Sequence, residues 1–194
     1  EFENTQIDDQ VLLKADGFPT YPLANVGDDR LMKITHVIRA EEWISSTPKH
    51  IRLYEVFGWE PPVWCHVPLL RNKDRTKISK RKNPTSLRWY EEQGYLPEAL
   101  VNFLGLMGFS MPENREIFTP AEMQEHFHLD KINAGGPVFD MEKLDWVNGQ
   151  YIRKLSPDDL ARRLGPFGAA GHDPALLARI VPLVQDRLPV LTDY

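Results

Sequence analysis

The spacing of apolar residues divides the chain into two parts. Up to residue 70, short apolar runs that suit buried strands alternate with stretches in which apolar residues recur at helical spacing. We expect strands at Val11–Leu13, Thr35–Ile38 and Cys65–Leu70, and helices at Tyr21–Met32 and Glu42–Phe57. Strands that alternate with helices favour parallel pairing through crossover connections. The first part is therefore predicted to be α/β.

Proline and glycine refine the two helices predicted in this part. Pro22 fits only the first turn of its helix, where the missing N–H costs nothing. Gly27 weakens the middle of the same helix. Pro48 interrupts the second helical stretch, so we expect a break or two shorter helices there.

The second part is predicted to be almost wholly helical. The expected helices are Ser86–Gln93, Pro97–Met107, Pro120–Phe127, Met141–Ile152, Pro157–Leu164 and Pro174–Leu188. Three of them begin with a good N-cap followed by proline, at Thr119-Pro120, Ser156-Pro157 and Asp173-Pro174. The glycine-rich stretch 165–173 is the best candidate for an internal linker.

Composition is that of an ordinary globular protein, with 42% hydrophobic and 26% charged residues among 194. A single cysteine, Cys65, excludes an internal disulfide and a multi-cysteine zinc site and suits a reducing compartment. No apolar run approaches the roughly 20 residues of a membrane span. We therefore expect a cytoplasmic location and no membrane association. The chain opens at Glu1 without a methionine, so we expect that it was cut from a longer protein.

Charge is unevenly distributed, because seven basic residues and one acid lie between Arg71 and Lys82 in a chain of net charge −5. The simplest interpretation is a solvated surface loop. The segment Lys77–Arg81, KISKR, also suits phosphate binding, since a compact turn could aim Lys77 and Lys80 at one phosphate chain while Ser79 adds a small donor. Its place after a strand agrees, because parallel sheets bind ligands beyond the carboxyl ends of their strands.

A second candidate site consists of Tyr21, Asn25, Arg39 and Trp43. Tyr21 and Asn25 are four residues apart and share one helix face. Arg39 follows the second predicted strand, and its planar fork can hold a carboxylate through two parallel hydrogen bonds. Trp43 could wall the same pocket. Taken singly, the aromatic residues are more often core residues and the arginine more often part of a surface ion pair.

Five long blocks resemble the bacterial glutamyl-tRNA synthetases, in the order in which that family has them. They are Leu12–Val26, Thr35–His50, Pro68–Lys82, Gly94–Pro112 and Gly135–Arg153, about three quarters of the chain. KISKR then stands as the second ATP motif of class I synthetases, whose general form is KMSKS. The resemblance implies a reaction in which ATP and Mg²⁺ activate glutamate as its adenylate, and the glutamyl group is transferred to the 3′ end of tRNA(Glu).

The resemblance also implies roles for individual residues. Lys77 and Lys80 would act on the ATP phosphates as catalytic residues. Leu69 and Leu70 would lie against adenine, Ile78, Ser79 and Arg81 would complete the ATP loop, and Glu42 would lie near the ribose or adenine. Tyr21, Asn25, Arg39 and Trp43 would bind L-glutamate. His126 and His128 could bind a metal, but no cysteine or third histidine is near them in the sequence, so a solvated helix end is favoured and no zinc is expected.

The implied architecture is the second half of a Rossmann-type parallel sheet followed by helical domains. Residues 1–85 would complete the catalytic domain, residues 86–156 would form a stem-contact domain on the tRNA, and residues 157–194 would begin the anticodon-binding region. We expect the first half of the fold, with its HIGH-type ATP motif, to be absent from the chain, and the isolated chain to be inactive. The oligomeric state is unreadable from the sequence, and a monomer is favoured.

Three residues depart from the family pattern, and two other functions remain open. Pro22, Gly27 and Arg30 stand where the family usually has histidine, valine and histidine. Pro22 and Gly27 are expected to loosen the helix that presents Tyr21 and Asn25. The alternatives are a non-catalytic tRNA- or RNA-binding module and a glutaminyl-tRNA synthetase-like paralogue.

Overall fold

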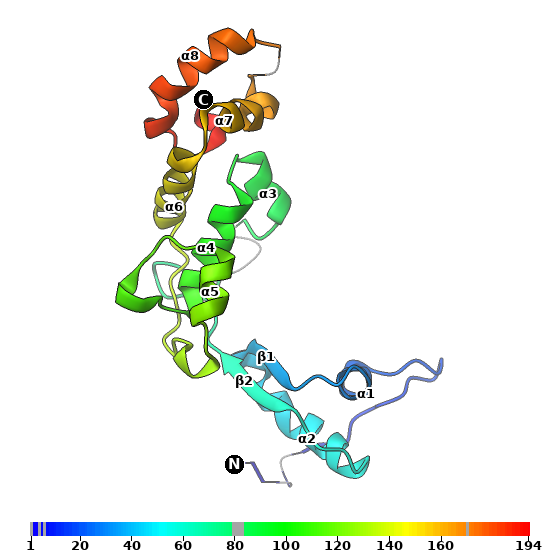
Figure 1. The fold of residues 1–194 in the computed structure, drawn as a ribbon. Coiled ribbons are helices and arrows are strands. Elements are labelled where there is room, and N and C mark those ends of the chain that lie inside the picture. Colours follow the sequence, from blue (N-terminus) through cyan, green and yellow to red (C-terminus); the bar gives the residue numbers. More distant parts are fainter. Residues whose placement is uncertain (1, 4, 6, 79–83, 170) are drawn as a thin grey trace. The chain divides into compact units, whose positions relative to one another are not determined.

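The chain forms two compact units, Glu1–Leu69 and Leu70–Tyr194, in the computed structural model (Figure 1). The structure describes residues 2–3, 5, 7–78, 84–169 and 171–194. A small parallel sheet in the first unit and a predominance of helix in the second confirm the predicted fold class. The domain boundaries at residues 85 and 156 stay predictions.

The N-terminal unit contains two strands and the helices next to them in the sequence. Helix α1 (Tyr21–Leu31) precedes β1 (His36–Ala40); a 3₁₀ helix, η2 (Glu41–Ser46), and α2 (Thr47–Val56) then lead to β2 (Val63–Val67). The strands pair in parallel from His36↔Val63 to Ala40↔Val67, as predicted (Figure 1). The helical stretch does divide near Pro48, which lies in the first turn of α2.

The predicted strand at Val11–Leu13 is wrong. Among the described residues, Leu13 makes only an isolated antiparallel bridge to Pro19, and 68% of Val11 is exposed. The turn at Asp16-Gly17, with Gly17 at φ +85°, folds the chain back so that Thr20 N–H donates to Leu12 O at 2.8 Å. The apolar run Val11–Leu13 thus takes part in a local hairpin turn and not in a sheet.

The C-terminal unit consists of six α-helices and short 3₁₀ turns within the described part of the chain. The helices are α3 (Leu87–Glu92), α4 (Pro97–Gly108), α5 (Pro120–His126), α6 (Met141–Lys154), α7 (Pro157–Leu164) and α8 (Pro174–Val184). All six were predicted, although α8 ends earlier than expected and continues as a 3₁₀ turn at Gln185–Arg187. The three predicted caps are confirmed, because Thr119, Ser156 and Asp173 each accept a backbone N–H with their side chains.

The main core of the C-terminal unit lies where α4 packs on α6. Fourteen buried residues form one cluster, which includes Phe103, Leu144, Val147 and Ile152. Two buried amides join distant segments within it. Asn148 accepts from Leu96 N–H and donates to Pro189 O, while Asn102 accepts from Phe118 N–H and donates to Glu116 O. Across the described residues of both units, every helix is too short or too polar to span a bilayer.

Candidate functional site

Arg39 is the centre of the candidate site in the N-terminal unit. It lies in β1, and its guanidinium reaches groups from η2, α2 and β2. Nη2 donates to Thr47 Oγ1 at 2.9 Å and to Trp43 O at 3.4 Å. Nη1 lies 3.1 Å from His50 Nδ1, and Nε donates to His66 Nε2 at 3.3 Å. We call Thr47, His50 and His66 the Arg39 seat.

The seat fixes the protonation of its own histidines. A guanidinium carries five N–H donors and no acceptor, so His50 Nδ1 and His66 Nε2 must both accept. Both rings are therefore neutral while these hydrogen bonds exist. His66 belongs to the seat because of strand register, since it is the parallel partner of Arg39 across the sheet.

Aromatic rings surround the same guanidinium. The Arg39 Cζ atom lies 4.7 Å from the Trp64 ring centroid and 5.7 Å from that of Trp43. Tyr21, at the start of α1, packs against Trp43 with ring centroids 5.2 Å apart. Three of the four residues predicted from sequence, Tyr21, Arg39 and Trp43, are thus brought together. A cation between ring faces is stabilised by their quadrupoles.

Helix α1 presents acceptors toward its buried side. Asn25 Oδ1 and Asp29 Oδ2 are buried and have no hydrogen-bond partner among the described residues. The two residues are four apart and so lie on one helix face. Buried acceptors without donors are costly, which makes this face suited to a ligand that carries N–H groups. Asn25 keeps its predicted role as a prediction, and Asp29 was missed by the sequence analysis.

Burial dominates the electrostatics of this cluster. It lowers the pKa of Arg39, whereas Tyr21 and Asp29 act in the opposite direction. Burial, and then the neighbouring Arg39 charge, lowers the pKa of His50 to about 4 and also lowers the pKa of His66. The Asp29 carboxyl has its pKa raised by burial, while Arg39 opposes that shift. The arrangement holds one cation beside neutral histidines, which suits an anionic group of a ligand.

The four hydrogen bonds of Arg39 change one detail of the sequence-based expectation. They engage four of its five N–H groups. A carboxylate gripped by two parallel hydrogen bonds would have to displace one of these partners. The same bonds, together with the two tryptophans, leave little rotational freedom to the side chain. Arg39 thus offers a fixed positive charge, and Tyr21 is a further hydrogen-bond partner of its side chain.

The basic loop begins in the C-terminal unit as a tight turn. Asn72 N–H donates to Thr76 O at 2.8 Å, and Asp74 accepts from the backbone and hydroxyl of Thr76. Arg71 and Lys77 form an antiparallel bridge that closes the turn. The predicted loop residues Ser79, Lys80 and Arg81 lie outside the described residues, so their roles stay predictions.

Not all of the basic residues in the turn are available to a ligand. Lys73 lies 3.1 Å from Asp140 and 3.0 Å from Glu142, at the start of α6. The carboxylates raise the pKa of Lys73 through these contacts. Lys77 lies at the end of the turn and is exposed. The local charge of the turn is therefore smaller than the sequence alone indicates.

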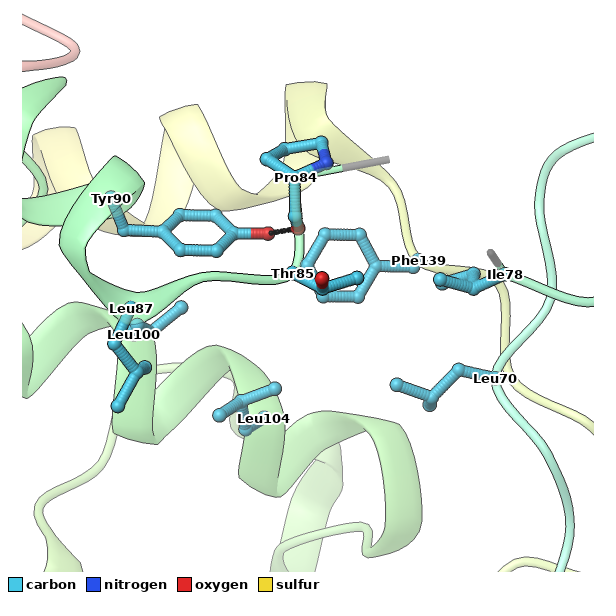
Figure 2. A pocket seen from close by; sticks show the side chains of 9 residues that line it. All are labelled: Leu70, Ile78, Pro84, Thr85, Leu87, Tyr90, Leu100, Leu104 and Phe139. Carbon is cyan, nitrogen blue, oxygen red and sulfur yellow. Dashed lines mark hydrogen bonds between the residues drawn. The ribbon is translucent and has the colours of Figure 1, made fainter. Parts of the chain in front are cut away.

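An apolar cavity of about 230 Å³ lies beside the two residues that flank this turn (Figure 2). Leu70 and Ile78 line it from the turn, and Tyr90 and Phe139 line it from the helical part of the same unit. Leu70 O also accepts from Ile78 N–H at 3.3 Å. The Tyr90 hydroxyl donates to Pro84 O at 2.8 Å, which ties the far end of the loop to α3 (Figure 2).

Two further predicted residues, Glu42 and Leu69, lie in the N-terminal unit. Glu42 is exposed in η2, and its role near a nucleotide stays a prediction. Its neighbour Glu41, which the sequence analysis did not select, accepts from Leu69 N–H at 3.4 Å. The described residues contain no cluster of three or more histidine, cysteine or acidic side chains placed to hold a metal ion.

Comparisons with known proteins identify the family of this chain. Residues 1–146 match the family model of the tRNA synthetases class I (E and Q), catalytic domain. The glutamate–tRNA ligase of Deinococcus radiodurans is 63% identical over 203 residues, covering 100% of this chain and 42% of that protein. The one from Cellvibrio japonicus is 57% identical, with coverages of 100% and 38%. The chain thus spans about two fifths of the length of these curated relatives.

A solved structure extends the agreement to the fold. The crystal structure of a glutamate tRNA ligase from Elizabethkingia meningosepticum, in complex with its amino acid, has a TM-score of 0.86 and 35% identity. It covers 97% of this chain and 42% of its own. The chain belongs to the class I tRNA synthetases of the glutamate and glutamine type. Within that family, its curated and structural relatives are glutamate–tRNA ligases.

Proposed function

We propose that this chain is part of a glutamate–tRNA ligase, which activates glutamate with ATP and transfers it to the 3′ end of tRNA(Glu). The observation that carries the proposal is the Arg39 cluster. A fixed guanidinium suits a carboxylate. The acceptors Asn25 Oδ1 and Asp29 Oδ2, which have no partner among the described residues, suit an ammonium group. A ligand with both groups is an amino acid, which agrees with the names of the relatives.

The basic loop would supply the nucleotide site. Lys77 and Lys80 would stabilise the charge that builds on the departing pyrophosphate when the carboxylate attacks the α-phosphorus. Leu69 and Leu70 would lie against adenine, and Ile78, Ser79 and Arg81 would complete the loop. Glu42 would lie near the ribose or adenine. Mg²⁺ would be bound chiefly through the phosphate oxygens, since it commonly enters such sites with the substrate.

The helical unit would contact tRNA. Helices from residue 86 onward would form the stem-contact domain, and the segment from residue 157 would begin the anticodon-binding region. A cytoplasmic location fits such an activity. We favour glutamate over glutamine as substrate because the relatives are glutamate ligases. A non-catalytic RNA-binding module would need no fixed cation beside buried acceptors.

ATP–pyrophosphate exchange by the full-length protein that carries this sequence tests the proposal. Arg39→Lys keeps the charge but loses the planar donor set, so the KM for glutamate should rise strongly with little change for ATP. Arg52→Lys is the matched control, because Arg52 is an exposed arginine whose ion-pair partner among the described residues is Glu55. An equal rise in the KM for glutamate and the KM for ATP would contradict the assignment of Arg39 to the amino-acid pocket.

The nucleotide site has a separate test in the same assay. Lys80→Ala should lower the exchange rate by a few hundred-fold, since one charged transition-state contact is typically worth ~3–4 kcal/mol. Lys73→Ala is its control, because the Lys73 side chain is held by Asp140 and Glu142 rather than directed to a ligand. A Lys80 variant within about threefold of the unmodified protein would contradict the assignment. A protein with no exchange activity at all would favour the RNA-binding alternative.

A further inference from the structure

We propose that Thr47 and His50 are positioning residues that hold the Arg39 guanidinium in the orientation needed to bind the amino-acid carboxylate. The proposal rests on the proposed function, because it takes Arg39 as the carboxylate-binding group. It adds two residues from α2 that touch neither substrate in that function and act only through Arg39.

The contacts come from a different element than Arg39 itself. Thr47 and His50 lie in the first turns of α2, three residues apart, and only 8% and 1% of their surfaces are exposed. Thr47 Oγ1 accepts from Nη2 at 2.9 Å, and His50 Nδ1 lies 3.1 Å from Nη1. Helix α2 therefore supplies one acceptor to each terminal nitrogen of the fork.

The position of α2 is itself fixed at this point. The Thr47 hydroxyl is 3.0 Å from Trp43 O, one turn back, and 3.1 Å from His66 Nε2 on β2. The His50 ring lies between aromatic neighbours, with centroids 5.8 Å from Trp64 and 6.2 Å from Tyr21. Because these residues are packed, the two acceptors cannot follow Arg39 if it rotates. They select one rotamer of it.

The acceptors that orient Arg39 are neutral, and this preserves its positive charge. A carboxylate in place of His50 or Thr47 would neutralise Arg39 and compete with the ligand for it. A hydroxyl and a neutral imidazole orient the same N–H groups while leaving the positive charge uncompensated. The charged group that acts on both histidines is Arg39 on β1, which disfavours a proton on either ring and so keeps both as acceptors, while Asp29 on α1 favours the charged form of Arg39. The seat therefore orients the Arg39 guanidinium toward a ligand without neutralising its positive charge.

Two matched pairs of variants in the full-length protein test the proposal by ATP–pyrophosphate exchange. Thr47→Val keeps the shape and removes the acceptor, and Thr47→Ser keeps the hydroxyl. His50→Leu removes the acceptor, and His50→Asn places an amide oxygen near the Nδ1 position. Hydrogen bonds to charged groups are worth enough to expect about a tenfold rise in the glutamate KM for Val and Leu. The Ser and Asn variants should stay within about threefold of the unmodified protein.

The readout separates positioning from a general loss of structure. For Thr47→Val and His50→Leu, the rate at saturating glutamate and the KM for ATP should stay within about twofold of those of the unmodified protein. Thr35→Val, an exposed control outside the seat, should keep both values within the same range. In an Arg39→Lys background, Thr47→Val should add almost nothing, because the group on which it acts is gone. Additive effects, or equal rises in the KM for ATP and for glutamate, would overturn the proposal.

The outcomes also separate this proposal from the proposed function. If Arg39→Lys raises the glutamate KM but Thr47→Val and His50→Leu leave it within about twofold, the seat has no positioning role and the proposed function stands. If Arg39→Lys itself leaves the glutamate KM unchanged, the assignment of Arg39 fails and the seat fails with it. Thr47→Val is nearly isosteric, so the test does not depend on whether His50→Leu folds.

Discussion

The two units use their interiors differently. Among its described residues, the N-terminal unit buries a cluster of three apolar residues, Val26, Leu53 and Tyr54. The C-terminal unit buries clusters of fourteen and of three. All three buried side-chain atoms without a hydrogen-bond partner among the described residues, Asn25 Oδ1, Asp29 Oδ2 and Trp64 Nε1, belong to the N-terminal unit.

The two units differ in whether their buried polar groups have hydrogen-bond partners. In the C-terminal unit the buried amides of Asn102 and Asn148 are satisfied and link distant segments. In the N-terminal unit, Thr47 and His50 bond to Arg39, whereas the atoms without a partner among the described residues belong to Asn25, Asp29 and Trp64. Rules that hold elsewhere in a protein, such as the pairing of buried polar groups, are commonly broken at functional sites. We therefore expect the unit that contains the candidate amino-acid site to be the less stable of the two.

The largest expected contrast is in hydrogen exchange of the 194-residue chain. Backbone amides of α4 and α6, in the fourteen-residue cluster, should exchange roughly 1,000-fold more slowly than those of α2, which rests on the three-residue cluster. Mass spectrometry of peptides from both units would measure this. Equal protection would mean that the two units unfold as one, and the comparison would fail.

A buried amide should matter more in the helical unit than its size indicates. Asn102→Ala leaves Phe118 N–H and Glu116 O without their partner inside the unit. We expect a loss of about 3 kcal/mol in the free energy of unfolding, from the unsatisfied buried N–H of Phe118, the lost bond to Glu116 O and the small cavity. Urea unfolding followed by circular dichroism measures it. Asn133→Ala, at an exposed asparagine, should cost less than ~0.5 kcal/mol; similar losses for both would contradict the role given to Asn102.

The helical unit was more predictable from sequence than the site. Its helix starts are fixed locally, as at Thr119, where the side chain and Glu122 form a capping box. The strand expected at Val11–Leu13 failed because an apolar triplet does not reveal whether a sheet partner exists. Tyr21, Arg39 and Trp43 were found by their types and spacing.

The partners of Arg39 could not be found in that way. Thr47 and His50 lie 8 and 11 residues beyond Arg39, and a proline between them hides the helical register. His66 is 27 residues away, and only the alignment of the two strands brings it to Arg39. A parallel pairing of the predicted strands could have indicated His66 as a neighbour.

The N-terminal unit should also respond to pH through His50. Its pKa is about 4 when folded, below the ordinary value of 6.5. Between these values the unfolded chain binds the proton and the folded one does not, so stability present above pH 6.5 is lost as the pH falls toward 4. The expected loss between pH 7 and pH 5 is roughly 2 kcal/mol.

Urea unfolding at the two pH values, followed by the indole NMR signals of the N-terminal unit, measures this loss. His50→Asn should flatten the dependence, whereas His36→Asn, at an exposed histidine, should leave it unchanged. His66 contributes with the same sign and Asp29 with the opposite sign, so the difference between protein and variant isolates His50. A slope that His50→Asn does not alter would show that the ring titrates alike in both states.

The smallest expected effect concerns Gly27, in the middle of α1. A Cβ built at Gly27 meets no atom within 4 Å, and Pro22 lies in the first turn, where its missing N–H removes no intrahelical bond. Of the two residues expected to loosen the helix, only Gly27 therefore weakens its interior. Gly27→Val should raise the stability of the N-terminal unit by roughly 0.5 kcal/mol and Gly27→Ala by about 1 kcal/mol, following helix propensity. Restoring the family residues at positions 22, 27 and 30 together should raise stability or glutamate affinity in the full-length protein, as measured by urea unfolding and by the glutamate KM. A valine variant that is less stable than the glycine protein would mean that α1 must bend or approach another surface at residue 27, and that the glycine is needed there.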